Sequence, residues 1–213
     1  MSNDTIVFFH NPMSRGRTVH WMLEEVGAPY EIKLLDFSKA EHKKPEYVAL
    51  NPMGKIPSIV HRDVVITETA AILTYLADAF PAAGLAPPLT DPKRGTYLRW
   101  LFFAAGCFEP AVVDKMLARP PVERKGALGY GSYEDAMRAV ETAIQPGPFI
   151  LGDRFSAADL YISAQLGWGL MTKAIEATPT LGAYVARATD RPAFKRALAQ
   201  NEALAAKLKS GAG

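Results

Sequence analysis

Residues 6–36 read IVFFHNPMSRGRTVHWMLEEVGAPYEIKLLD and decide the fold of the first part of the chain. The stretch opens with four apolar residues, Ile6–Phe9, which predict a buried strand. Apolar residues then recur at the three- and four-residue spacing of one helix face: Val19, Met22, Leu23 and Val26. Gly27 is the expected left-handed C-cap, and alternation from Tyr30 onward predicts a second strand. A β-α-β unit of this kind has parallel strands and a right-handed connection.

The next residues extend this unit into a larger α/β domain. A short helix is expected near residues 44–48, followed by two brief apolar runs, Ser58–Val60 and Val64–Ile66. The polar residues His61–Asp63 lie between these runs, which is a hairpin pattern. Residues 68–80 then have helical spacing. The first eighty residues are therefore predicted to have the order β-α-β-α-β-β-α.

The remainder of the chain has helical patterns and no strand pattern. Prolines and a glycine cluster in residues 81–91, which predicts a linker. Helices are expected at residues 92–117, 133–144, 157–172, 181–188 and 192–208, and Ser156–Asp159 has the form of a capping box. The expected fold class is α+β, with an α/β domain over residues 1–80, the linker at 81–91 and an all-helical domain over 92–213.

Composition excludes several classes of protein. The 24 Lys and Arg residues nearly balance the 22 Asp and Glu residues, so the net charge of +2 argues against a nucleic-acid binder that works by bulk charge. One cysteine allows neither an intramolecular disulfide nor a Cys-based zinc cluster. The longest apolar stretch, Trp100–Phe108, is far shorter than the roughly 20 residues of a membrane span, and the N-terminal residues do not have the form of a signal peptide. These features predict a cytoplasmic protein that binds neither membranes nor nucleic acid.

Four motifs give the chain a resemblance to a known family. Asn51–Pro57 is similar to a segment that leads into a cis-proline, and Glu68–Thr69 to an acid–hydroxyl pair that opens a helix. Ser14–Arg17 is similar to a loop that carries a catalytic hydroxyl, and Ser156–Asp159 to a capping box in a helical domain. In this order they resemble the cytosolic glutathione transferases, whose first domain has the thioredoxin fold. Because the first loop has Ser14 and no cysteine, the resemblance is to serine-type bacterial members, theta-like or delta-like.

This resemblance implies a catalytic role for Ser14. The thiol of glutathione resembles free cysteine, with a pKa of about 8.5, so it is mostly protonated at neutral pH. A hydroxyl that donates a hydrogen bond to sulfur favours the thiolate, and the positive end of the following helix adds to the effect. Arg15 is either a further source of positive potential or a solvated loop cation. The alternative for Ser14 itself is an ordinary N-cap or turn residue.

The resemblance also implies that Glu68, Thr69, Ile56 and Pro57 bind the tripeptide. Glu68 would pair with the γ-glutamyl ammonium group, and Thr69, with the free N–H groups of its helix, would bind the carboxylate. A cis bond at Ile56–Pro57 would let the backbone of Ile56 pair with the cysteinyl backbone of glutathione, like an added strand. The alternatives are ordinary helix capping for the first pair and the start of an edge strand for Pro57.

Lys55 and His42 complete the implied glutathione site. The serine-type pattern places a basic residue at each of these positions, near the glycyl carboxylate. Taken alone, each is more often a solvated polar residue, and the match is better at Lys55, because Gly54 and Ile56 flank it.

A pocket for an apolar electrophile is expected at Met13 and at aromatic-rich residues after the linker. The candidates are Met13, Trp100, Phe103 and Cys107. The alternative is that the aromatic stripe is core and that Cys107 is a small buried apolar residue. The histidines show no metal-ligand spacing, so no metal is expected.

These observations predict a glutathione S-transferase that takes glutathione as co-substrate and conjugates it to apolar electrophiles, as in detoxification. The rate would come from a larger thiolate fraction and from the proximity of the reactants. The alternatives are a glutathione-dependent peroxidase or isomerase, or a non-catalytic binding or scaffold protein. The resemblance further implies a homodimer.

Overall fold

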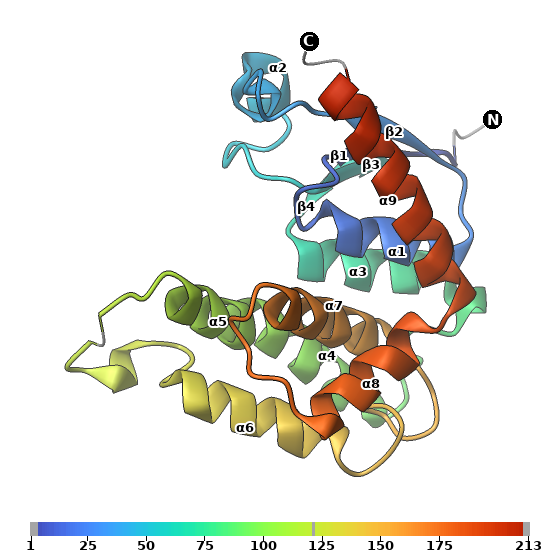
Figure 1. The fold of residues 1–213 in the computed structure, drawn as a ribbon. Helices are drawn as coiled ribbons and strands as arrows, with labels where there is room; N and C mark the ends of the chain where they lie inside the picture. The colour runs from blue at the N-terminus through green and yellow to red at the C-terminus, as the bar shows by residue number, and fades with distance from the viewer. Residues whose placement is uncertain (1–3, 121, 211–213) are drawn as a thin grey trace. The chain divides into compact units, whose positions relative to one another are not determined.

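A computed structural model describes residues 4–120 and 122–210 of the chain. The chain forms two compact units (Figure 1). The first unit contains the residues before Gly84 together with those from Arg191 onward, and the second contains Gly84–Asp190. The first unit is therefore assembled from two segments that are far apart in the sequence.

A mixed four-stranded sheet forms the centre of the first unit. Its order is β2 (Tyr30–Leu34), β1 (Ile6–His10), β3 (Ser58–His61) and β4 (Val64–Thr67). β1 is parallel to β2 and antiparallel to β3, which is antiparallel to β4. Arg62 and Asp63, with φ of 50° and 62°, form the two-residue turn between β3 and β4, as the hairpin pattern predicted.

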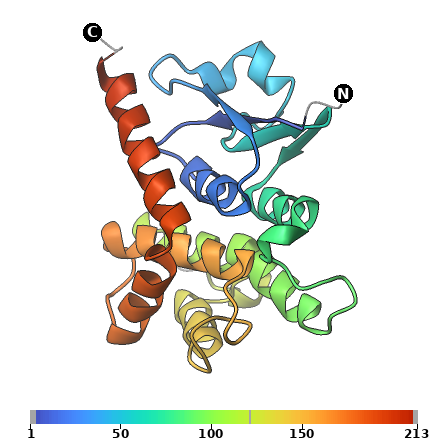
Figure 2. The same ribbon diagram turned by 90° about the vertical axis from the view of Figure 1, so that its right-hand side faces the viewer.

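Helices cover both faces of this sheet. Figures 1 and 2 show α1 (Gly16–Val26) and α3 (Thr69–Ala79) together on one face, with α2 (Pro45–Val48) and the short η1 (Glu41–Lys43) on the other side. Burying an apolar stripe of α1 stabilises this arrangement: Val19, Met22 and Leu23 are fully buried. The predicted β-α-β-α-β-β-α order and the thioredoxin-like fold class are confirmed.

The last helix differs from the expected division of the chain. The sequence placed residues 92–213 in one helical domain, but α9 (Pro192–Ser210) packs against α1 of the first unit. Arg191 makes two hydrogen bonds to the carboxylate of Glu25, at 2.6 and 2.7 Å, and Phe194 contacts the Trp21 ring edge-on. Helical spacing shows that a helix buries one face, but it does not show which surface receives that face.

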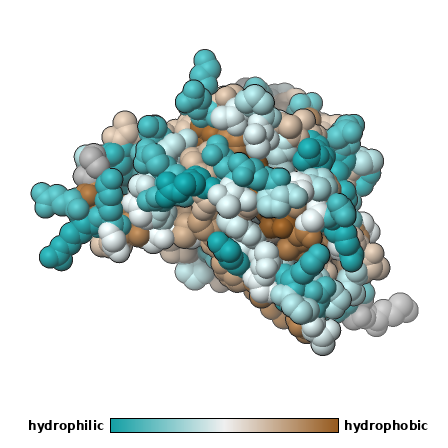
Figure 3. Space-filling model, turned by 90° about the horizontal axis from the view of Figure 1, so that it is seen from below, coloured by the Kyte–Doolittle hydropathy of each residue, from teal (hydrophilic) through white to brown (hydrophobic). Residues whose placement is uncertain are grey.

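Helices make up the regular structure of the second unit. They are α4 (Lys93–Phe103), η3 (Ala104–Phe108), α5 (Glu109–Met116), η4 (Lys125–Ala127), α6 (Tyr133–Ile144), α7 (Ala157–Met171) and α8 (Pro179–Thr189), while η2 (Pro81–Ala83) ends the first segment of the first unit. The predicted all-helical character of this part is confirmed. Figure 3 shows one face of the molecule, where small apolar patches lie between polar side chains.

The predicted helix at 92–117 is continuous but contains a π-helical turn. The turn is η3, and it ends where the N–H of Glu109 donates to the carbonyl of Ala104. Pro110 follows directly and has no N–H, and its ring crowds the carbonyl four residues earlier, so the helix widens at this point. The side chain of Gln165 on α7 donates to the carbonyl of Ala104 and to Glu109.

The predicted capping box opens α7 and is buried. Asp159 accepts hydrogen bonds from the backbone N–H and the hydroxyl of Ser156, at 3.0 and 2.7 Å. It also accepts from the N–H of Ile150 and the hydroxyl of Tyr184. Burial raises the pKa of this carboxyl although four donors surround it. Asp159 therefore connects the segment before α7 to α8.

Candidate functional site

The strand register brings the glutathione-site candidates to one edge of the sheet. Ser58, the first residue of β3, pairs with Phe9 near the end of β1 and with Thr67 at the end of β4. Three loops therefore meet at this edge: the one after β1 with Ser14, the one before β3 with Lys55, Ile56 and Pro57, and the one after β4 with Glu68 and Thr69. The segment after β2, which contains His42, begins at the same edge.

Ser14 lies in the turn between β1 and α1 and makes two hydrogen bonds there. Its hydroxyl donates to the carbonyl of Asn11 at 2.7 Å, and its oxygen accepts from the N–H of Gly16 at 3.0 Å. The N-cap position itself is occupied by Arg15, whose side chain makes no capping bond. Ser14 therefore has the turn role that the sequence left open, and it is also partly exposed beside the positive end of α1.

An Asn-Pro-Met turn occurs on both sides of this site. In the first, the side chain of Asn11 accepts from the N–H of Met13 at 2.8 Å, and in the second Asn51 accepts from that of Met53 at 3.1 Å. Asn11 also donates to the carbonyl of Leu35, which ties its turn to the segment after β2. The sequence reasoning did not recognise these two asparagines, and the repeated Asn-Pro-Met triplet at 11–13 and 51–53 was the signal for them.

Hydrogen bonds from two side chains fix the backbone of the loop that carries Lys55. The hydroxyl of Tyr47 and the side-chain amide of Asn51 both donate to the carbonyl of Lys55, at 2.5 and 2.9 Å, and the same hydroxyl bonds to Ser58. Burial raises the pKa of Tyr47, so it remains a neutral hydroxyl. The side chain of Lys55 is exposed, so its amino group is available to a ligand while its backbone is fixed.

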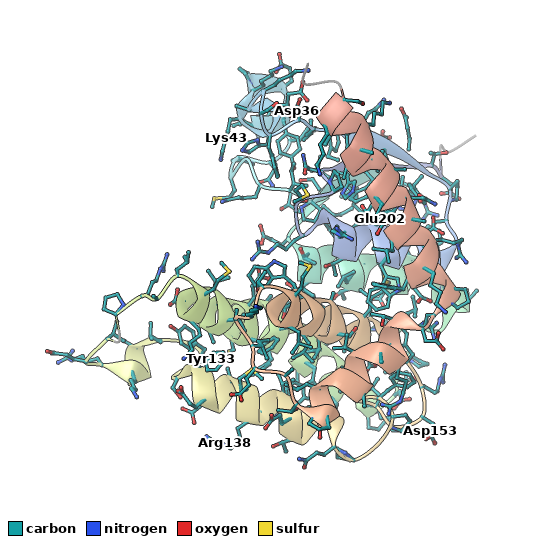
Figure 4. The ribbon with its side chains drawn as sticks, viewed as in Figure 1. Asp36, Lys43, Tyr133, Arg138, Asp153 and Glu202 are labelled. Atoms are coloured by element: carbon teal, nitrogen blue, oxygen red, sulfur yellow. The ribbon has the colours of Figure 1, made fainter. Side chains whose placement is uncertain are left out.

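His42 lies in η1 and is brought next to Gly54. A β-carbon at Gly54, which has φ of 56°, would be 2.8 Å from the carbonyl of His42, so only glycine allows this approach. The ring of His42 packs edge-on against Phe37. Lys43, labelled in Figure 4, donates from Nζ to the carbonyl of Met53 at 3.0 Å. The structure thus places His42 and Lys43 beside the loop that carries Lys55, and these three residues form a basic cluster whose role in binding stays a prediction.

The peptide bond between Ile56 and Pro57 is cis, as the resemblance implied. Pro57 is buried and lies directly before β3. Among the described residues, the backbone of Ile56 makes no hydrogen bond, whereas the carbonyl of its neighbour Lys55 makes two. The Ile56 backbone is therefore available to pair with an extended ligand.

Glu68 has an unusual backbone conformation at the start of α3. Its φ of 65° and ψ of 120° are rarely adopted by a residue with a side chain, and such strain concentrates at functional sites. No side chain caps α3 in the part of the chain that the structure describes. The capping alternative for Glu68 and Thr69 is therefore not realised, and the first N–H groups of α3 are available for an anion.

The electrophile-pocket candidates fall on both units. Met13 belongs to the first unit and is 74% exposed. Trp100 is largely buried in the core of the second unit, in edge-on contact with Phe103. Cys107 lies in the π-helical turn and donates to the carbonyl of Gly129. Phe103 and Cys107 are half-buried, so they offer some surface, and the role of these residues in binding an electrophile stays a prediction.

The part of the chain that the structure describes contains no candidate for a metal site or for a membrane-spanning helix. In residues 4–120 and 122–210, no three His, Cys, Asp or Glu side chains are grouped so that they could hold a metal ion. Within the same ranges, no helix has both the length and the apolar character that crossing a membrane requires.

Comparisons with known proteins identify relatives of the chain. Residues 5–78 match the family described as glutathione S-transferase, N-terminal domain. Glutathione S-transferase GstA of Escherichia coli is 28% identical over 193 residues, which are 89% of this chain and 96% of that protein. Glutathione S-transferase GST-4.5 of Xanthomonas campestris is 30% identical over 156 residues, 70% of this chain and 75% of that protein.

Solved structures agree with these relatives. A glutathione transferase from Methylococcus capsulatus superposes with a TM-score of 0.78 at 29% identity, over 92% of this chain and 98% of that one. A sphingomonad glutathione S-transferase complexed with glutathione gives a TM-score of 0.76 at 30% identity, over the same shares. The fold, the order of the motifs and these similarities over most of the sequence lead to one conclusion: the chain belongs to the glutathione S-transferase family of enzymes.

Proposed function

We propose that the chain binds glutathione at the sheet edge formed by the Ser14, Lys55–Pro57 and Glu68–Thr69 loops and conjugates it to apolar electrophiles. The observation that carries the proposal is the meeting of three features at this edge: a hydroxyl before α1, an unpaired Ile56 backbone and the uncapped, strained start of α3.

Each part of the tripeptide has a counterpart in this arrangement. The γ-glutamyl carboxylate would take the free N–H groups of α3 and the hydroxyl of Thr69, and its ammonium group the carboxylate of Glu68. The cysteinyl backbone would pair with Ile56. The glycyl carboxylate would lie near the basic cluster of Lys55, His42 and Lys43. Tyr47 and Asn51 fix the carbonyl of Lys55 in this cluster, and Gly54 allows the close approach of His42.

Ser14 would hold the thiolate. Its hydroxyl now donates to the carbonyl of Asn11. Rotation about the Cβ–Oγ bond would redirect this hydrogen bond to the sulfur without moving the oxygen. The thiol proton leaves to solvent, and the sulfur lone pair then forms a bond to an electrophilic carbon. In a substitution the leaving group departs with its bonding electrons, and in an addition the product carbon takes up a proton. Proximity and the larger thiolate fraction supply the rate.

A glutathione titration followed by a turnover assay tests this proposal. Binding in the micromolar to millimolar range, together with conjugation of members of a panel of aryl halides, epoxides and unsaturated carbonyl compounds, is the expected result. Turnover of hydroperoxides alone would instead support a peroxidase, and binding without any turnover would support a scaffold protein. No binding of glutathione would reject the proposal. We further infer from the family resemblance that the enzyme is a homodimer.

A further inference from the structure

His10, the last residue of β1, is fully buried and has a fixed orientation. Its Nε2 lies 2.7 Å from the side-chain oxygen of Asn201 on α9. The amide nitrogen of Asn201 donates to the carbonyl of Ala197, which determines that the amide oxygen is the atom facing the ring. Nε2 of His10 therefore carries the proton, and Nδ1 is the nitrogen with a free lone pair.

This second nitrogen faces the turn that contains Ser14. Nδ1 is buried and has no hydrogen-bond partner among the described residues. A β-carbon placed on Gly16 would be 2.4 Å from Nδ1 of His10 and 2.9 Å from Oγ of Ser14, so both atoms border the same small space at the start of α1. The imidazole ring thus packs against the Ser14–Gly16 turn.

The groups around the ring keep it neutral. The pKa of His10 is lowered to about 3, mainly by burial and also by the charges of His20 and Arg17 on α1, while the hydrogen bond to Asn201 on α9 opposes the shift. His20 also bonds to the same Asn201 oxygen, at 3.1 Å. Between pH 5 and pH 9 His10 therefore has one protonation state, and whatever it does for the turn it does by position and not by a change of charge.

We propose that His10, held by Asn201 of the C-terminal helix, is a positioning residue that sets the location of the Ser14 hydroxyl. The juxtaposition of Nδ1, Gly16 and Ser14 Oγ on one side of the ring, and of Asn201 on the other, carries this inference. It rests on the proposed function, because it assigns His10 a role in holding the group that stabilises the glutathione thiolate.

The effect of losing the ring follows from the geometry of a hydrogen bond. A hydroxyl–sulfur bond weakens steeply when the oxygen moves by a fraction of an ångström or the angle opens. Without the ring, a void opens beneath Gly16 and the turn relaxes into it. The thiolate would then be less stabilised, whereas the ends of the tripeptide, which are held by other loops, would bind as before.

The test measures the pKa of the glutathione thiol in the complex by the ultraviolet absorbance of the thiolate. His10→Gln keeps an amide that can donate to Asn201 but removes the ring and Nδ1. We expect this thiol pKa to rise by about 0.5–1 unit, which is a roughly three- to tenfold smaller thiolate fraction at pH values well below the pKa, with the Kd of glutathione changed less than about twofold.

His61→Gln is the matched control. His61 is also fully buried in the same sheet, at the end of β3, and its ring bonds to Tyr75 and stacks on Phe80. It lies at the other end of β3 from Ser58, away from the Ser14 turn. We expect this variant to lose stability without any change in the thiol pKa. Equal thiol pKa values in wild type and His10→Gln, or equal shifts in both variants, would overturn the inference.

Two further measurements keep the test decisive if His10→Gln does not fold. Asn201→Ala frees the ring from its partner, and it should raise the thiol pKa in the same direction by a smaller amount; no change would count against the inference. In the wild-type protein, the ¹⁵N NMR signal of Nδ1 should be that of an unprotonated nitrogen and should move when glutathione is added. A signal that does not respond to glutathione would likewise reject it.

The wild-type titration separates this inference from the proposed function. If glutathione bound to the wild-type protein has the thiol pKa of free glutathione, the proposed activation of the thiol fails before any variant is examined. If the wild-type complex has a lowered thiol pKa and His10→Gln retains it, only the role of His10 fails.

Discussion

Gly16 lies so close to His10 that no other residue fits at this position without displacing the ring. The ideal β-carbon would be 2.4 Å from Nδ1, well inside contact distance, although the backbone of α1 is otherwise regular there. The glycine is therefore required by its neighbour and not by its own φ angle. Since the ring in turn is bonded to Asn201, His10 connects the first turn of α1 to α9.

Gly16→Ala should destabilise the protein by about 1–3 kcal/mol, because the added methyl group collides with a ring that cannot rotate. Gly95→Ala on α4 is the control: no atom lies within 4 Å of its β-carbon, so this change should be neutral or slightly stabilising. Urea denaturation measures both. A shorter side chain at position 10, in Gly16→Ala/His10→Ser, should recover part of the loss, and strict additivity of the two changes would show that the residues are not coupled.

Ser14→Ala should raise the pKa of bound glutathione by about one to two units, since it removes a hydrogen bond that is stronger to thiolate than to thiol. Turnover at pH values well below the thiol pKa should fall by about ten- to a hundredfold, and the pH–rate profile should shift to higher pH by the same amount as the titrated thiol. Ser38→Ala, whose hydroxyl donates to Asp36 in a nearby loop, should change neither. An unaltered profile in Ser14→Ala would leave Ser14 as a turn residue only.

Glu68→Ala should weaken glutathione binding by about 1.5–3 kcal/mol, roughly ten- to a hundredfold in Kd, through loss of the partner for the γ-glutamyl ammonium group. The fold should persist, because the side chain is exposed and makes no capping bond. Glu46→Ala, which removes an exposed first-turn acid from α2, should leave the Kd unchanged. Isothermal calorimetry gives both constants, and equal values for the two variants would remove Glu68 from the site.

Burial of His10 makes stability depend on pH in a defined window. Its pKa is 6.5 in the unfolded chain and about 3 in the folded protein, so between these values the unfolded state binds the extra proton. The free energy of unfolding therefore has its full value above pH 6.5. It decreases as the pH falls toward 3, by up to about 1.4 kcal/mol per pH unit. Urea denaturation from pH 7 to pH 4 should show this slope, and His10→Gln should reduce it. A slope shared by both proteins would assign the effect to carboxylates.

Asp159→Ala should lower the free energy of unfolding by at least about 3 kcal/mol, because it leaves the N–H of Ile150, the N–H of Ser156 and the hydroxyl of Tyr184 without their acceptor in a buried place. The partly exposed N-cap of α6 provides the comparison. Ser132→Ala removes similar capping chemistry at the surface and should cost only about 1 kcal/mol. Equal losses of unfolding free energy in the two variants would mean that burial does not increase the contribution of the capping hydrogen bonds to stability.

Much of the fold could be predicted because local patterns determine it. The four apolar residues of β1, the spacing on α1 and the two residues between β3 and β4 each specify one element, and short connections leave few topologies. The position of α9 could not be predicted. Its buried face contains two alanines, Ala193 and Ala197, and a single buried asparagine, Asn201, and such a face has no strong apolar stripe to assign to one surface or another.

The candidate site also has features that could be predicted from the sequence and features that could not. The resemblance to the glutathione transferases singled out the residues that meet at the sheet edge, and the strand register brings their loops together, while their role in binding stays a prediction. The direction of the Ser14 hydroxyl could not, because a turn serine bonds to whichever acceptor the local backbone presents. A positioning role for His10 could not be predicted either, because a histidine at the end of an apolar run has no distinguishing sequence pattern. The role depends on neighbours that only the structure places beside it.

The pairing of α9 with α1 has a consequence for synthesis on the ribosome. Residues before Gly84 emerge first, but the partner of Glu25 is Arg191 and the partner of His10 is Asn201. Translation adds about 5–20 residues per second, so Glu25 and His10 remain without these partners for several seconds or longer, until the partners leave the exit tunnel. During that interval the surface of α1 that α9 will cover is open to chaperones, and the unit that begins first in the chain is the last to be completed.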